Sequence, residues 1–112
     1  MRAEPTPPAP EEFVLSPDAR LILDAGGLHL RRLPPMVDLG GPWDDLYAVS
    51  VARADGPPRV SVTFVDGLAR LAEGRSPATA TRFDLPPSAD HAPEELVAAI
   101  ERFRRARRDA TP

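Results

Sequence analysis

The stretch Gly41-Pro42-Trp43-Asp44-Asp45-Leu46 stands at the middle of a series of strand-like segments that ends in one amphipathic helix. Glycine and proline interrupt the segment before it. The alternating run from Tyr47 to Arg53 begins directly after it. The six residues are therefore expected to turn the chain from one group of strands into the next.

Alternation of apolar and polar residues predicts strands on both sides of this turn. The first group comprises a short run at 13–15, a hairpin of 20–23 and 28–31, and a segment at 36–39 that ends before Gly40. The second group comprises 47–53, with Tyr47, Val49 and Val51 on one face, followed by 60–64 and 81–85. Residues 68–78 fit either a helix or a loop.

A C-terminal helix is expected from Pro93 to about Arg108. Proline suits the first helical turn because its missing N–H would be unpaired there anyway. Two glutamates follow, where the helix dipole favours negative charge. Helical spacing gives one apolar face, made of Leu96, Ala99, Ile100, Phe103 and Ala106. This face must pack on the preceding strands.

Six bulky residues are expected to anchor the core: Trp43, Phe64, Phe83, Leu96, Ile100 and Phe103. Trp43 has two interpretations. It is either a core residue packed beneath the helix near Phe103, or an exposed contact for a partner, as tryptophan often is at interfaces.

The length of 112 residues fits one domain. We expect a disordered Pro-rich tail at 1–11, one domain at 12–108 and a frayed end at 109–112. No apolar leader or spanning segment is visible, which predicts a cytoplasmic protein. The chain has no Lys, Asn, Gln or Cys, and all its basic charge lies on 14 Arg. This bias indicates a GC-rich bacterial genome, such as that of an actinobacterium.

Candidate chemical groups are few. His29 and His91 could pair as metal ligands with Asp24 or Asp90, or they are ordinary surface residues. Asp44 and Asp45 could serve acid–base chemistry, but Asp44 is better placed to cap the turn after Trp43. No serine has nucleophile-elbow flanks and no glycine pair forms a phosphate loop. The sequence therefore predicts no catalytic, metal-binding or cofactor-binding residue.

The strongest surface signal is a run of arginines at the end of the expected helix: Arg102, Arg104, Arg105, Arg107 and Arg108. Residues 1–91 carry nine Arg against 13 acidic residues, a balance of −4, whereas residues 92–112 carry five against four, a balance of +1. These arginines are candidate partner contacts. A solvated helix end that complements the dipole is the alternative.

Three segments resemble the small bacterial pleckstrin-homology-like (PH-like) domains: Gly26-Gly27-Leu28-His29-Leu30, Pro42-Trp43-Asp44-Asp45-Leu46 and Pro93-Glu94-Glu95-Leu96. The resemblance implies an α+β fold over 12–108. In it a strongly bent antiparallel sheet, or partly open barrel, of six to seven strands is capped by one C-terminal helix. The first hairpin loop of lipid-binding members is basic, whereas this one contains Asp24. Phosphoinositide binding is therefore not expected.

The resemblance implies a non-enzymatic module for protein contacts, with no cofactor and a protein partner that the sequence does not identify. The alternative is a membrane-surface or nucleic-acid adaptor that acts through the Arg-rich helix end. The net charge of −3 argues against nucleic acid, and a membrane surface stays open. A small enzyme of unrecognised type is the third interpretation. The oligomeric state is left open.

Overall fold

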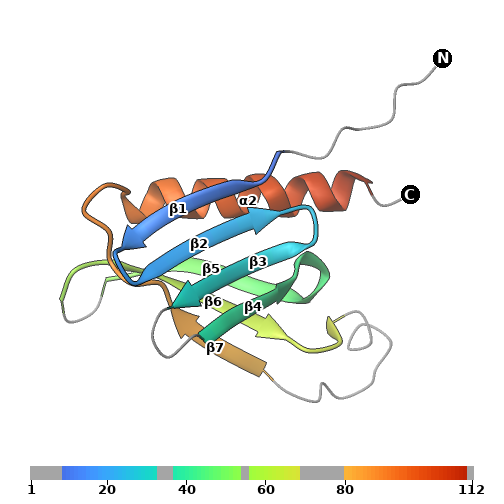
Figure 1. Ribbon diagram of the computed structural model, residues 1–112. Coiled ribbons are helices and arrows are strands. Elements are labelled where there is room, and N and C mark those ends of the chain that lie inside the picture. Colours follow the sequence, from blue (N-terminus) through green and yellow to red (C-terminus); the bar gives the residue numbers. More distant parts are fainter. Residues whose placement is uncertain (1–8, 33–36, 54–55, 69–79, 111–112) are drawn as a thin grey trace.

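The computed structural model describes residues 9–32, 37–53, 56–68 and 80–110. Its elements in chain order are β1 (Glu11–Ser16), β2 (Ala19–Asp24), β3 (Gly27–Arg32), β4 (Val37–Pro42), the 3-10 helix η1 (Trp43–Asp45), β5 (Leu46–Ala52), β6 (Arg59–Val65), β7 (Ala80–Asp84) and α2 (Pro93–Ala110) (Figure 1). Most of the predicted tail, and most of the segment left open between helix and loop, lie outside the described residues.

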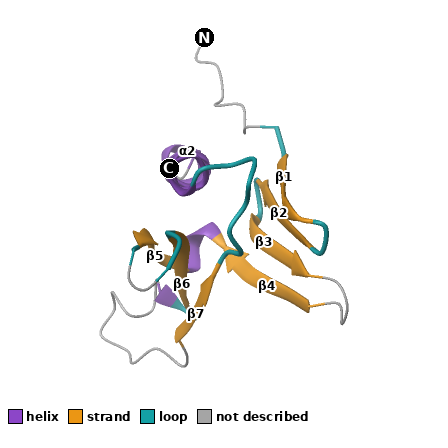
Figure 2. Ribbon diagram, turned by 90° about the vertical axis from the view of Figure 1, so that its left-hand side faces the viewer, coloured by secondary structure: helices purple, strands orange, loops and turns teal. Residues whose placement is uncertain are grey.

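The strands form two antiparallel meanders, one with the order β1-β2-β3-β4 and one with the order β5-β6-β7. Figure 2 shows the two sheets close together near β4 and β7, with α2 across the side where β1 and β5 diverge. The predicted α+β class is confirmed: the described residues form seven antiparallel strands and one C-terminal helix, in an arrangement consistent with PH-like domains. No helix in the described part of the chain is long and apolar enough to cross a membrane.

The hairpin of β2 and β3 supplies one wall of the core. Leu21 pairs with Leu30 and Leu23 pairs with Leu28, and all four side chains are fully buried. The turn between the strands is closed by Asp24, whose Oδ1 accepts the backbone N–H groups of Gly26 at 2.8 Å and Gly27 at 3.0 Å. Period-two burial on this hairpin is what the alternation predicted.

The second sheet confirms one predicted face and overturns another. Val60, Val62 and Phe64 of β6 are buried as expected. Tyr47 does not share a face with Val49, because a bulge between Leu46 and Ala48 shifts the register of β5. The extra residue of a bulge leaves the ladder, and Tyr47 is 58% exposed.

The predicted end of the fourth strand before Gly40 is wrong. β4 continues through Gly41 to Pro42 and stays paired with β3. Gly40 has a φ of 134°, and a Cβ built there would lie 1.9 Å from the carbonyl oxygen of Leu28. Glycine therefore does not end the strand here but lets two backbones approach closely.

Trp43 lies in the core, 4% exposed, and joins three parts of the fold. Its ring stacks on Phe103 of α2, with centroids 5.9 Å apart and planes at 23°. Its Nε1–H donates to the backbone carbonyl of Asp24 at 2.7 Å. Trp43 thus connects the β2–β3 turn and the junction between the sheets to the helix.

The other expected anchors are also packed inside. Leu96, Ile100 and Phe103 are buried on the apolar face of α2, together with Ala99. Phe83 is half-buried and stacks on Phe64 with centroids 6.2 Å apart. The described helix ends at Ala110, two residues after the expected end, and β1 begins at Glu11, which the sequence placed in the tail.

We expect Trp43→Phe to lower the free energy of unfolding by about 1–3 kcal/mol, because the partly buried carbonyl of Asp24 would lose its donor. The measurement is urea unfolding followed by far-UV circular dichroism, since the variant lacks the chain's one tryptophan. Tyr47→Phe is the matched control, because it also alters a single aromatic polar group but at an exposed position. Equal midpoints for the Trp43 variant and wild type would contradict the bridging role.

Candidate functional site

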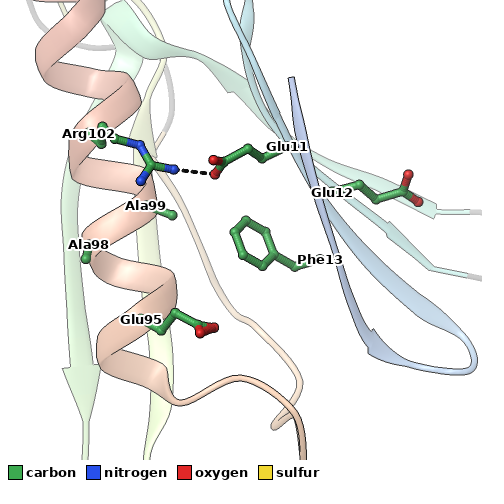
Figure 3. Close-up of a pocket in the computed structure, with 7 residues that line it drawn as sticks. All are labelled: Glu11, Glu12, Phe13, Glu95, Ala98, Ala99 and Arg102. Carbon is green, nitrogen blue, oxygen red and sulfur yellow. Dashed lines mark hydrogen bonds and ion pairs between the residues drawn. The ribbon is translucent and has the colours of Figure 1, made fainter. Parts of the chain in front are cut away.

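An open groove runs between β1 and the first half of α2 (Figure 3). Its volume is about 490 Å³. Phe13 from β1 and Ala98 and Ala99 from α2 give the apolar lining, and Glu11, Glu95 and Arg102 supply the charged groups that face the groove. Figure 3 shows Glu11 and Phe13 directed toward the helix and Glu12 directed away from it, as strand alternation requires.

The helix contributes to the groove because its residues recur at helical spacing. Three residues follow Glu95 at helical spacing: Ala98, Ala99 and Arg102 are three, four and seven positions after it. This spacing puts all four on one face of the helix. Ala98 is exposed and Ala99 is buried. These two adjacent alanines have short side chains, so the helix does not fill the space beside the Phe13 ring.

An ion pair at one end of the groove and a ring contact at the other join β1 to α2 and to the residues that precede it. Arg102 forms an ion pair with Glu11 at one end. At the other end His91 Nδ1 lies 2.5 Å from Glu95 Oε2, and the His91 ring meets the Phe13 ring edge-to-face at 5.1 Å. These contacts fix the distance between the two walls.

The start of α2 is held by a further ion pair. Glu94 contacts Arg53, which follows β5. A backbone hydrogen bond in the first helical turn and, second, the Arg53 guanidinium lower the pKa of Glu94 from its ordinary value of 4.5. Both effects favour the carboxylate, and the backbone hydrogen bond is available because Glu94 stands in the first turn of the helix, where N–H groups have no partner within the helix.

The five arginines predicted as partner contacts do not form one patch. Arg102 turns to the groove, whereas Arg104, Arg107 and Arg108 line a second hollow of about 350 Å³ beside Trp43. Glu101 pairs with Arg104 at 3.4 Å. Their role as partner contacts stays a prediction.

Asp44 does not cap the turn, contrary to the expectation. The 3-10 helix has no side-chain cap, and Asp44 Oδ2 instead accepts from Arg107 at 3.1 Å. The two residues are 63 positions apart, so neither local spacing nor turn propensity could have indicated the pair. Asp45 is half-buried and belongs to neither hollow.

The two histidines have separate surroundings. His29 on β3 lies 3.6 Å from Asp24, and His91 contacts Glu95 and Phe13 before α2. Within the described ranges no three His, Cys, Asp or Glu residues gather where they could hold a metal ion.

The sequence alone did not indicate the groove, because Glu11 fell within the predicted tail and Phe13 within a short apolar run. The sequence signal for the groove was the pair Ala98-Ala99 on a helix whose other apolar residues are mostly bulky. This pair indicates a groove only when it is known that β1 lies opposite it. No family model, curated protein or solved structure matches the chain.

We expect Glu94→Gln to lower stability at neutral pH and to make no difference at strongly acidic pH. A depressed folded-state pKa stabilises the fold above the unfolded value of 4.5, and this contribution disappears as the pH falls through the lowered value. The measurement is the urea midpoint of wild type and variant across this pH range. Arg53→Ala should remove only part of the pH-dependent difference, because the backbone hydrogen bond is the larger cause. A difference that is constant with pH would contradict the assignment.

Proposed function

We propose that this protein is a non-enzymatic protein-interaction module of the PH-like type, that it acts in the cytoplasm, and that the groove between β1 and α2 is its docking place. The observation that carries the proposal is the groove itself. It combines an apolar lining from Phe13, Ala98 and Ala99 with charged groups along its walls.

The size and composition of the groove suit a segment of another protein. Binding pockets commonly measure about 300–1,000 Å³ and combine apolar walls with a few polar groups that fix orientation. An apolar side chain inserted beside Phe13 would be shielded from water by the helix on one side and by β1 on the other. Burial of this kind, surrounded by polar groups, is the usual arrangement of an interface centre.

The test is photo-crosslinking from the groove in host lysate. A benzophenone amino acid at Ala98 should give an adduct with a discrete protein, whereas the same group at Arg105, which is exposed on α2 and lines neither hollow, should not. Excess unlabelled wild type should suppress the adduct, and excess Ala98→Arg should not. Equal labelling from both positions, or suppression by both competitors, would overturn the docking place.

A second candidate function is attachment to an anionic membrane surface through the C-terminal half of α2. Two observations favour it. Arg104, Arg107 and Arg108 line the hollow beside Trp43, and Arg105 and Arg108 have no carboxylate partner among the described residues. Basic groups near a charged surface each contribute about 1 kcal/mol to binding, and salt weakens this attraction.

Sedimentation with vesicles of phosphatidylserine and phosphatidylcholine tests the second candidate. If it holds, wild type should sediment in about 150 mM salt, and replacement of Arg102, Arg104, Arg105, Arg107 and Arg108 by Ala should abolish sedimentation. The variant must keep its wild-type unfolding midpoint for the comparison to count. Equal sedimentation of the two proteins, or none by either, would exclude the membrane function and leave the groove as the docking place.

A further inference from the structure

The outer edge of β1 has no strand partner in the part of the chain that the structure describes. β1 is the terminal strand of its sheet, and among the described strands it pairs only with β2. No backbone hydrogen bond from another segment to this strand occurs among the described residues. Half of its backbone N–H and C=O groups are therefore free to pair with an extended chain.

This free edge adjoins the groove. A strand added to β1 would lie about 4.8 Å from it, beside the helix face that carries Glu95, Ala98 and Arg102. Successive side chains of such a strand would alternate between the groove and solvent. One apolar side chain could occupy the space between Phe13 and Ala98, because the short alanine side chain leaves room there.

The charges near the outer edge of β1 indicate which charge an added strand should carry. Two carboxylates, Glu11 and Glu95, face the groove against the single guanidinium of Arg102, while Glu12 points away from the helix and pairs with Arg20. A second copy of β1 would bring its own two glutamates to the same edge, and like charges across paired strands are destabilising. A segment with lysine or arginine would instead complement the lining.

We infer that the groove takes an extended, basic segment of a partner protein, which pairs with β1 as a fifth strand and inserts one apolar side chain beside Phe13. The inference rests on the proposed function and names the chemistry of its partner. It also assigns opposite roles to two groove residues. Arg102 competes with the incoming basic side chain for Glu11, to which it is paired, whereas Glu95 attracts that side chain.

The experiment titrates the full chain with nine-residue probe peptides and follows backbone amide signals by NMR. The first probe alternates valine and threonine about a central leucine and carries a lysine at each end. The second replaces both lysines with glutamate. The third keeps the lysines and has N-methyl groups on alternate residues, which remove the donors that a strand needs. A separate N-methyl version covers the other set of alternate residues.

The lysine probe should shift the amide signals of β1 and of α2 around Ala98. The glutamate probe and one of the two N-methyl probes should bind more than about tenfold more weakly, because the first meets like charge and the second loses ladder hydrogen bonds. Arg102→Ala should strengthen binding of the lysine probe, and Glu95→Gln should weaken it, each by roughly two- to fivefold, the worth of one exposed ion pair. Ala98→Arg should block it, whereas Ala80→Arg, an exposed alanine on β7, should not.

Three results would overturn the inference: no binding of the lysine probe, equal binding of the glutamate probe, or equal binding of both N-methyl probes and their parent. Crosslinking from Ala98 decides the proposed function separately. An adduct in lysate together with a silent lysine probe would keep the docking place and reject strand pairing. Absence of the adduct together with absence of lysine-probe binding would reject the docking place itself.

Discussion

The contact between Trp43 and its two partners determines how the rest of the molecule is arranged. A buried indole needs an acceptor for its N–H as well as apolar neighbours for its ring. The carbonyl of Asp24 meets the first need and Phe103 meets the second. Because Trp43 opens the 3-10 helix between β4 and β5, this one side chain ties the hairpin turn of the first sheet, the junction to the second sheet and the helix into a single core.

The position of α2 follows from this contact, and the groove follows from the position of α2. Its apolar face packs on the core through Leu96, Ile100 and Phe103. The adjoining face, with Ala98, meets β1 at a distance that the Arg102–Glu11 ion pair and the His91–Phe13 contact maintain. Because Ala98 and Ala99 have small side chains, the space between these two walls stays unfilled. The groove is thus a consequence of where the helix is held and of which residues it presents there.

Helical geometry also explains why a run of arginines in the sequence is not a patch in space. Successive residues of a helix point about 100° apart, so a run of arginines is distributed around the helix and its members face different surroundings. Arg102 faces β1, while Arg104, Arg107 and Arg108 face the region of Trp43. The charge asymmetry of the sequence is real, but the arginines are divided between the groove, the second hollow and, for Arg105, neither of the two.

The sequence by itself determined the α+β class, the alternation that buries Val60, Val62 and Phe64, and the limits of α2 to within two residues, because these depend on local periodicity and on end signals such as Pro93. Only the tertiary structure decided the continuation of β4 through Gly40, the exposure of Tyr47 and the pairing of Asp44 with Arg107. Each depends on contact with another strand or with a residue distant in the chain. The groove belongs to the second group, since Phe13 and Ala98 are ordinary residues of a strand and a helix until the fold sets them opposite each other.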